Sequence, residues 1–282
     1  MAINSTCAIV CCSNGIKKTE TENIQLLKYK LHNIFSDVKT GKFIYSYNNT
    51  VSSASAKSRA EELEELFRSG VSDIFDISGG DICNELLPYL DYNIISKSES
   101  VFWGYSDLTV LINAIYAKTG KAGILYQIRN IIGPCGDLQQ KRICDYFKGG
   151  SNDLFDVKYN MLNGDGMKGI VVGGNIRCFL KLAGTEFFPE LYGKILLLEA
   201  LSGDEAKIRT YLAQLKQLGA FDKINGIILG TFTNMEKHST IPTVEDLVLD
   251  ITDKPLPIAK TYEIGHAGNS KAIFIGKEIT IE

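Results

Sequence analysis

Three side chains in this sequence, a serine, a glutamate and a histidine, could together perform nucleophilic catalysis. That chemistry needs a hydroxyl, a base within hydrogen-bond reach and an acid that orients the base. The chain has only three histidines, which narrows the choice of base. His32 falls within a helical pattern and His238 in a polar loop, whereas His266 follows an apolar strand pattern in the glycine-rich stretch YEIGHAGNS. A histidine there is well placed to face a crevice; a turn histidine without a role is the alternative.

Ser106 is the candidate nucleophile. The stretch VFWGYSDLTVLINAIYAKTG predicts a strand, a sharp corner at Ser106 and a helix that ends at Gly120. A serine on such a corner projects from a strained turn at a helix N-terminus, where free N–H groups favour a developing oxyanion. Leu108 occupies the position of the second glycine of the usual G-x-S-x-G pattern. The alternative role for Ser106 is an ordinary helix cap.

Glu199 ends the apolar run KILLLE and is the candidate acid. The carboxyl ends of the strands in an open α/β sheet face the ligand crevice, so a carboxylate there can reach a histidine. A solvated glutamate is the alternative. Two glycine pairs, Gly79-Gly80 and Gly173-Gly174, also follow strand patterns and could bring backbone N–H groups close to a substrate. Neither pair matches G-x-G-x-x-G or a Walker loop.

The elements that must position these residues alternate between strand and helix patterns. In the first part of the chain, strands are expected at CAIVCC, KFIYSY, SDIFDIS, VFWG and AGILY. Between them, ENIQLLKYKLHNIF and SASAKSRAEELEELF have helical spacing, and NELLPYLDY predicts a short helix that is broken near Pro88. This alternation predicts an α/β fold with a mostly parallel sheet that helices cover on both faces.

A second α/β pattern begins at Gly166. The runs GIVVGGN, KILLLEA and GIILGTF predict buried strands, DEAKIRTYLAQLKQLGAFDKI predicts a long amphipathic helix, and the tail KAIFIGKEITIE predicts a half-exposed strand. Residues 131–165 are turn-rich, with one short helix possible at QQKRICDYF, and are expected to form a linker or a loop over a site. The expected organisation is an N-terminal domain over residues 1–135, a linker over 136–165 and a C-terminal domain over 166–282.

The composition is that of an ordinary globular protein, with 45% apolar residues, 22% charged residues and a net charge of -3. No basic stripe offers itself to nucleic acid or to an anionic membrane, and no apolar run reaches the ~18 residues of a membrane span. The N-terminus lacks the positive region of a signal peptide, and the seven cysteines form no C-x-x-C pair or zinc-spaced cluster. We therefore expect a cytoplasmic protein with reduced cysteines and without nucleic-acid or membrane partners.

Taken in order along the chain, the blocks SGGD, LLPYLDY, GYSDLT, GGN, GKILLLE and GH resemble the LD-carboxypeptidase and microcin C self-immunity family of serine peptidases. The resemblance runs from AIVCCSNG to the final strand, and GYSDLT and GKILLLE are its most specific blocks. It implies a triad with Ser106 as nucleophile, Glu199 as orienting acid and His266 as general base. It also implies an oxyanion hole made by the backbone N–H groups of Asp107 and Gly80.

The same resemblance implies a fold and an assembly. A doubly wound N-terminal α/β domain would contribute the serine, and a smaller C-terminal α/β domain would contribute the glutamate and the histidine. The active site would lie at the interface of the two domains. The resemblance further implies a homodimer that uses no metal and no organic cofactor.

Within the family, the sequence resembles the microcin C immunity branch more closely. Peptidases that act on peptidoglycan usually carry an Arg-Gly-Gly-Tyr-Gly-like block, whereas here Ser78 replaces the arginine and Asp81 replaces the tyrosine. The branch implies hydrolysis of the amide in an aminoacyl-nucleotide-like antibiotic, and it can stack a base on a loop tryptophan. The ring-bearing candidates that this chain offers in residues 131–165 are Tyr146, Phe147, Phe155 and Tyr159.

Two other functions stay open on the sequence. One is an LD-carboxypeptidase that removes a terminal D-amino acid from a cytoplasmic murein tetrapeptide. The other is a non-catalytic α/β protein that binds a small molecule, in which Ser106 only caps a helix. The expected substrate is thus a small peptide or an aminoacyl-nucleotide conjugate in the two enzymatic cases.

Overall fold

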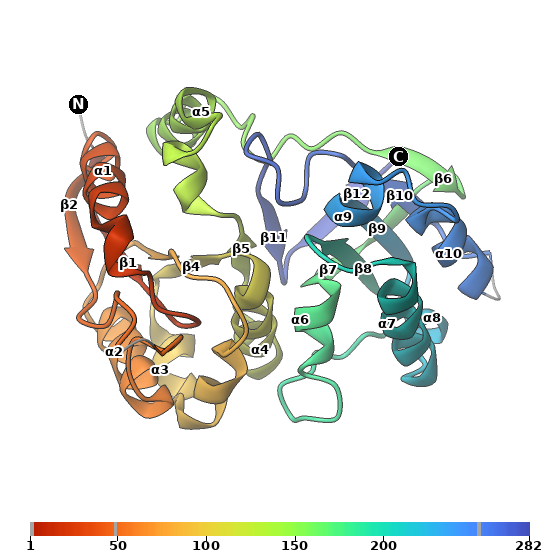
Figure 1. The fold of residues 1–282 in the computed structure, drawn as a ribbon, viewed down its shortest axis with the longest axis horizontal. Helices are drawn as coiled ribbons and strands as arrows, with labels where there is room; N and C mark the ends of the chain where they lie inside the picture. Colours follow the sequence, from red (N-terminus) through yellow and green to blue (C-terminus); the bar gives the residue numbers. More distant parts are fainter. Residues whose placement is uncertain (1–2, 48–49, 253–254) are drawn as a thin grey trace.

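The chain folds into two six-stranded sheets that lie side by side, with the N-terminal half of the chain around one and most of the C-terminal half around the other (Figure 1). The structure, a computed structural model, describes residues 3–47, 50–252 and 255–282. Among these residues, none of the helices is both long and apolar enough to cross a membrane.

The first sheet has the strand order β11-β5-β4-β3-β1-β2, in which β1 to β5 are parallel and β11 pairs with β5 in the antiparallel sense. Its strands are β1 (Ile3–Val10), β2 (Phe35–Thr40), β3 (Asp73–Asp76), β4 (Val101–Gly104), β5 (Gly123–Leu125) and β11 (Ile273–Ile275). Its helices are α1 (Thr21–His32), α2 (Ala56–Arg68), α3 (Tyr92–Lys97), α4 (Thr109–Thr119) and α5 (Gly136–Lys148). Short 3₁₀ helices occupy Lys18–Glu20, Cys83–Tyr89, Ser106–Leu108 and Ile128–Ile132.

Both faces of the first sheet are buried under helices. Ala8 and Val10 of β1 belong to an apolar cluster with α2, α3 and α4, whereas Cys7 and Ile9 belong to a second cluster with α1 and α5. Successive side chains of a strand point to opposite faces, so this division shows helices on both sides. The expected doubly wound, mostly parallel sheet is confirmed.

The second sheet has the order β12-β7-β8-β9-β10-β6, with parallel strands in its centre and an antiparallel strand at each edge. Its strands are β6 (Asn160–Asn163), β7 (Met167–Asn175), β8 (Lys194–Ala200), β9 (Gly226–Phe232), β10 (Ile258–Lys260) and β12 (Glu278–Ile281). Its helices are α6 (Ile176–Leu180), α7 (Glu205–Gln217), α8 (Ala220–Lys223), α9 (Thr233–Lys237) and α10 (Val244–Ile251).

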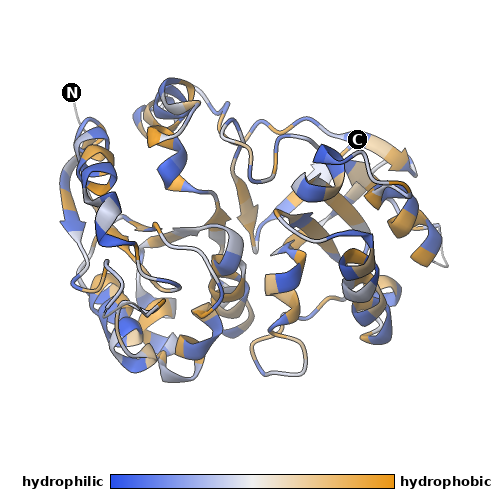
Figure 2. Ribbon diagram, in the orientation of Figure 1, coloured by the Kyte–Doolittle hydropathy of each residue, from blue (hydrophilic) through white to orange (hydrophobic). Residues whose placement is uncertain are grey.

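A single apolar cluster joins the two sheets. Leu196 and Leu198 of β8 pack on the side of α7 and α10, whereas Ile195 and Leu197 belong to the same cluster as α4 of the first sheet. Figure 2 shows apolar residues concentrated on the strands of both sheets and along one side of the helices. The two sheets are therefore packed as parts of one buried core.

One expected strand was wrong. Residues 42–47 form an isolated bridge between Ile16 and Tyr45, and the strand beside β1 is instead β2. Only Phe35 and Val38 of β2 are buried, because β2 lies at the edge of the sheet. Edge strands commonly carry polar side chains, and this polarity removes the pattern that would have marked the strand in the sequence.

The C-terminal tail differs from expectation, whereas residues 136–165 contain the expected helix together with more regular structure than a linker. The tail forms two strands in different sheets, because Gly276 turns the chain at φ +88° between β11 and β12. Residues 136–165, expected as a linker, contain α5, whose Ile143 is fully buried against the first sheet, and β6, which forms an edge of the second. Membership of the sheets therefore crosses the expected boundaries near residues 135 and 166.

The placement of β11 in the first sheet gives a stability prediction. Ile275 is fully buried in the cluster that joins the sheets. We expect Ile275→Ala to lower the free energy of unfolding in urea by about 2–5 kcal/mol, because truncation of a buried isoleucine leaves a cavity. The matched control is Ile279→Ala on β12, where the side chain is only partly buried, and its loss should be clearly smaller. Equal losses would contradict this role of β11.

Candidate active site

Ser106 stands at the corner between β4 and α4. Its φ is +56°, in the left-handed region that residues with a side chain rarely adopt. A Cβ added at Gly104 would lie 2.5 Å from the Cβ of Leu108, so the corner needs a bare backbone at Gly104. The first glycine of the pattern is thus required by close packing, and Leu108 fills the place of the second. Strain of this kind, at the exposed corner of a strand and a helix, is typical of a nucleophile elbow.

Glu199 is fully buried at the end of β8 and its carboxylate accepts three hydrogen bonds. Its Oε2 accepts from His266 Nδ1 at 2.8 Å and from the Tyr105 hydroxyl at 3.1 Å, and its Oε1 accepts from Asn175 Nδ2 at 3.0 Å. A buried carboxylate without such partners would be strongly destabilising. Burial and the adjacent Glu199 raise the pKa of Tyr105 well above its ordinary value, so its hydroxyl remains a donor.

His266 packs against the residue that precedes Ser106. Its ring packs edge-on against Tyr105, the residue before Ser106, with 4.9 Å between the ring centroids. Its Nε2 is buried and has no hydrogen-bond partner among the residues that the structure describes. One ring nitrogen is thus fixed by a buried carboxylate, whereas the other makes no hydrogen bond to any described residue. The structure therefore brings two of the three residues singled out in the sequence into direct contact, and the third lies one residue from Tyr105.

In the Gly173-Gly174 pair, the Gly173 N–H is engaged within the protein and is not free for a substrate, as the sequence had suggested it could be. The N–H of Gly173 donates to Asn113 Oδ1 at 2.9 Å, and Asn113 Nδ2 donates back to the Gly173 carbonyl at 2.9 Å. A Cβ at Gly174 would lie 2.8 Å from Thr109 Oγ1. The pair therefore allows α4 to pack directly on β7. In the sequence, this contact could have been suspected from Asn113, a lone asparagine in the apolar run LTVLINAIY.

The other glycine pair, Gly79-Gly80, forms a turn that is held against the loop after β1. Gly80 has φ +116°, and a Cβ there would lie 2.2 Å from the Asn14 side chain. The Asn14 N–H donates to the Gly79 carbonyl at 3.0 Å, and the Asp81 N–H donates to Asn14 Oδ1 at 3.1 Å. The turn can therefore accept only glycine at position 80.

Asp76, at the end of β3, fixes the start of the same turn. Its carboxylate accepts from the N–H groups of Cys12 and Ser78, each at 2.7 Å. Complete burial raises the pKa of Asp76 to about 6, although these hydrogen bonds oppose the rise. The Ser78 hydroxyl also donates to Asp76 and accepts from the Ser13 N–H at 3.0 Å. Ser78 thus has a defined structural role in the loops that surround the corner.

The Asp107 carboxylate is also fully buried. It accepts from the Ser13 hydroxyl at 2.6 Å, from the Cys83 N–H at 2.9 Å and from Lys181 Nζ at 2.6 Å. Lys181 comes from the end of α6, so this contact joins the corner to the second sheet. The Asp107 carboxylate therefore stabilises the structure. Of the polar groups of Asp107, the backbone N–H is the one that could face a substrate.

Gln139 of α5 holds the loop that carries His266. Its Nε2 donates to the carbonyls of Gly268 and Ser270 at 2.8 and 2.7 Å, and its Oε1 accepts from the Tyr126 hydroxyl at 2.9 Å. Gln139 is fully buried, and its hydrogen bonds with Ser270 and Tyr126 are shielded from water. Residues 131–165 thus support the His266 loop from one side.

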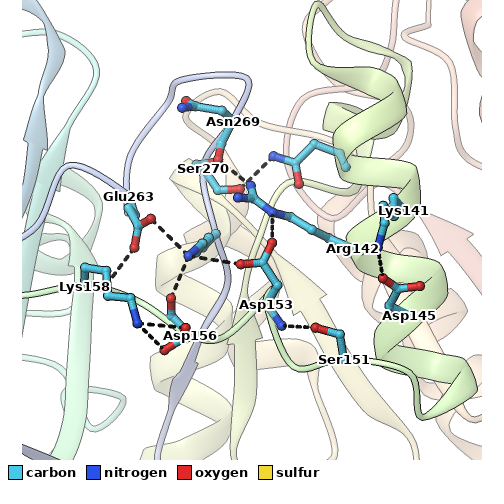
Figure 3. Close-up of polar contacts among 12 residues, drawn as sticks. Lys141, Arg142, Asp145, Ser151, Asp153, Asp156, Lys158, Glu263, Asn269 and Ser270 are labelled. Carbon is cyan, nitrogen blue, oxygen red and sulfur yellow. Dashed lines mark hydrogen bonds and ion pairs between the residues drawn. The ribbon is translucent and has the colours of Figure 1, made fainter.

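A second set of polar contacts joins the same loop to residues 151–158 (Figure 3). Arg142 donates from Nε to Asp153 at 2.7 Å and from Nη1 to the Asn269 carbonyl at 2.8 Å. Lys271, almost fully buried, pairs with Glu263 at 3.0 Å and donates to the Asp156 carbonyl at 2.6 Å. The loop is therefore fixed at both ends.

The aromatic candidates for base stacking are partly buried and pack against the core. Tyr146, Phe147 and Phe155 surround Trp103, with ring centroids 6.0, 5.8 and 6.2 Å away. Tyr159 packs against the cluster that joins the sheets. A cavity of about 820 Å³ lies elsewhere, over the loops that follow β1 and β2, and Asn14 and the exposed Tyr47 are among the residues that line it. Among the described residues, no cluster of His, Cys, Asp or Glu could hold a metal ion.

We expect Gln139→Leu to loosen the His266 loop, because it removes the donor from the buried Ser270 carbonyl and from the partly buried Gly268 carbonyl. Amide hydrogen exchange of residues 264–271 should become at least about tenfold faster, since the loss of buried hydrogen bonds is worth on the order of 1–3 kcal/mol. The matched control is Gln140→Leu, because Gln140 donates instead to the Lys30 carbonyl and lies near Cys144. Unchanged exchange in Gln139→Leu would contradict the support role of α5.

Two family models match the chain in order. The LD-carboxypeptidase N-terminal domain matches residues 7–126, and the LD-carboxypeptidase C-terminal domain matches residues 168–281. The microcin C7 self-immunity protein MccF of Escherichia coli is 26% identical over 92% of this chain and 84% of its own length. The putative carboxypeptidase YocD of Bacillus subtilis is 30% identical over 83% of this chain and 80% of its own length.

The fold has a solved counterpart. The structure of MccF in complex with glutamyl sulfamoyl guanosine superposes with a TM-score of 0.85 at 21% identity, over 99% of this chain and 93% of that one. At that identity the likeness concerns the fold alone. Since both domain models match in order and YocD reaches 30% identity over most of the chain, the protein belongs to the LD-carboxypeptidase family, which includes MccF and its microcin-immunity relatives.

Proposed function

We propose that this protein is a serine peptidase of the microcin-immunity type, which hydrolyses the amide bond of small aminoacyl-nucleotide-like compounds. Ser106 is the nucleophile, His266 the general base and Glu199 the orienting acid. The observation that carries the proposal is His266, whose Nδ1 is bound to the buried Glu199 while its buried Nε2 has no partner in the part of the chain that the structure describes. An imidazole held in this way is prepared to accept a proton from one direction only.

The proposed reaction has two halves. Ser106 Oγ attacks the amide carbonyl carbon and passes its proton to His266 Nε2, and the oxyanion accepts hydrogen bonds from the N–H groups of Gly80 and Asp107. His266 then gives the proton to the leaving amine as the C–N bond breaks. A water molecule, deprotonated by His266, hydrolyses the acyl-enzyme and restores Ser106.

Glu199 favours this cycle through its fixed position. It stabilises the imidazolium that forms when His266 takes the proton, and it keeps the remaining N–H on Nδ1. The Tyr105 and Asn175 donors occupy the rest of the carboxylate, so it need not reorganise as the charge on the histidine changes. Preorganisation of this kind lowers the cost of charge development.

The substrate class rests on relatives. A solved structure of MccF holds glutamyl sulfamoyl guanosine, and MccF is 26% identical to this chain. The second candidate function is removal of a terminal D-amino acid from a murein tetrapeptide, which the 30% identity to the putative carboxypeptidase YocD favours. Both reactions would use the same three residues. A variant of one of these residues therefore tests the mechanism but not the substrate, and the substrate needs a test of its own.

The catalytic test is Ser106→Ala. We expect turnover to fall by at least about 10⁴-fold, because loss of a triad nucleophile removes the acyl-enzyme route. Circular dichroism should be unchanged. Ser96→Ala, an exposed serine on α3, is the matched control and should keep full activity. Full activity of Ser106→Ala on the substrate that the wild type cleaves would refute the assignment.

The substrate test compares glutamyl sulfamoyl guanosine with a murein tetrapeptide, each incubated with the wild-type protein. Mass spectrometry of the products should detect free glutamate and the sulfamoyl nucleoside. Release of the terminal D-amino acid, with no cleavage of the nucleoside conjugate, would instead establish the carboxypeptidase. If neither compound is cleaved, the microcin-immunity assignment fails for this conjugate, and a serine-directed probe then decides whether Ser106 is reactive.

A further inference from the structure

We propose that Arg177 and Lys181 of the second sheet are positioning residues that hold the two halves of the oxyanion hole in register. The inference rests on the proposed function, because it concerns the N–H groups of Gly80 and Asp107. These donors come from different loops, one after β3 and one after β4. An oxyanion hole works only when both donors lie about 2.7–3.1 Å from one oxygen. Something must therefore fix the separation of the loops.

Arg177, on α6, holds the first loop. Its Nη2 donates to the Gly80 carbonyl at 3.3 Å, and its Nη1 forms an ion pair with the Asp81 carboxylate. The hydrogen bond from Arg177 holds the pKa of Asp81 below its ordinary value, so the pair is charged at neutral pH. The residue whose N–H is the proposed donor is thus held through its carbonyl.

Lys181 joins the first loop to the second. Its Nζ donates to the Asp81 carbonyl at 2.8 Å and to Asp107 Oδ1 at 2.6 Å. One ammonium group therefore binds the residue after Gly80 and also the residue that supplies the other donor. A carbonyl and a carboxylate that share one cation cannot move apart without loss of a charge-assisted hydrogen bond.

The loops have complementary contacts on the side of the first sheet. Asn14 packs on Gly80 and accepts from the Asp81 N–H, and the second oxygen of Asp107 accepts from Ser13 and from the Cys83 N–H. The Cys83 N–H and Ser13 therefore also bridge the two loops, from the side of the first sheet. Lys181 binds both loops from the opposite side and ties their separation to α6.

α6 also connects Lys181 to Glu199, the partner of His266. Asn175 accepts the Cys178 N–H as the N-cap of α6, and the same side chain donates to Glu199. A helix that begins at a partner of Glu199 thus carries Arg177 and ends at Lys181. The arrangement places the oxyanion donors relative to the base through a single short element.

The test measures how fast a fluorophosphonate reacts with Ser106, which needs no knowledge of the substrate. In this reaction Ser106 Oγ bonds to phosphorus, fluoride leaves with the P–F electron pair, and the hydroxyl proton passes to His266. The developing negative charge on the phosphoryl oxygen needs the oxyanion donors. We expect Lys181→Met to slow the labelling at least about tenfold, because shifts near 1 Å at a reacting centre cost up to about 10²-fold.

Two further variants keep the test decisive. Asp81→Asn removes an exposed carboxylate from the Arg177 pair, preserves the fold and should slow labelling about threefold or more. Lys118→Met is the matched control: it breaks the 2.6 Å pair with Glu186, which also joins the two parts of the chain but touches neither loop. Lys181→Arg should recover part of the rate, since it restores a cation to Asp107.

A purely structural role predicts a different pattern. If Lys181 and Asp81 had only a structural role, their substitutions would lower the thermal unfolding midpoint together with the labelling rate. If they position the donors, the variants should stay folded and label more slowly, and the pH midpoint of labelling should not change. Labelling rates within twofold of the wild type for both folded Lys181→Met and Asp81→Asn would overturn the proposal. If Lys181→Met does not fold, Asp81→Asn decides alone. If the wild type is labelled no better than Ser106→Ala, the proposed function itself fails.

Discussion

The buried carboxylate of Glu199 is the constraint on which the rest of the site depends. A charge in the core is tolerated only with a full set of donors, and here they come from β7, from the residue before Ser106 and from the loop after β10. Satisfying one carboxylate therefore forces three separate segments to meet. The contact of His266 with Glu199 follows from that requirement as much as from any catalytic need.

The two sheets must then be held rigidly, because these donors belong to both. The glycines of β7 let α4 approach closely enough for Asn113 to bind the backbone of Gly173 in both directions. β11 crosses into the first sheet, and the contacts of Figure 3 tie α5 to the loop that follows β10. The chain thus exchanges elements between the sheets, which suits a site assembled from both better than two separately folded domains would.

Sequence patterns located the ends of strands well, because burial leaves long apolar runs that stop abruptly. Ser106 and Glu199 were found at such ends, whereas the strand expected just before His266 was wrong, because His266 lies in an irregular loop six residues after β10. The residues that support them were not found, since Gln139 and Lys181 are polar side chains on helices and have no spacing that distinguishes them from surface residues. Asn113 was visible only as a polar residue in an apolar helix. Beside local partners, each of these residues has partners 60 to 131 residues away along the chain, and local patterns do not encode such contacts.

The electrostatics of the proposed oxyanion hole add a further reason for Lys181. A backbone N–H at Asp107 would be a poor place for a developing anion if the carboxylate of the same residue were left uncompensated, because like charges repel strongly in a site of low dielectric constant. Lys181 Nζ lies 2.6 Å from that carboxylate and neutralises it, while the Cys83 N–H and Ser13 hydroxyl spread the remaining charge. In the proposed mechanism the lysine would thus act on the oxyanion hole in two ways, through the distance between its donors and through the electric field at their position.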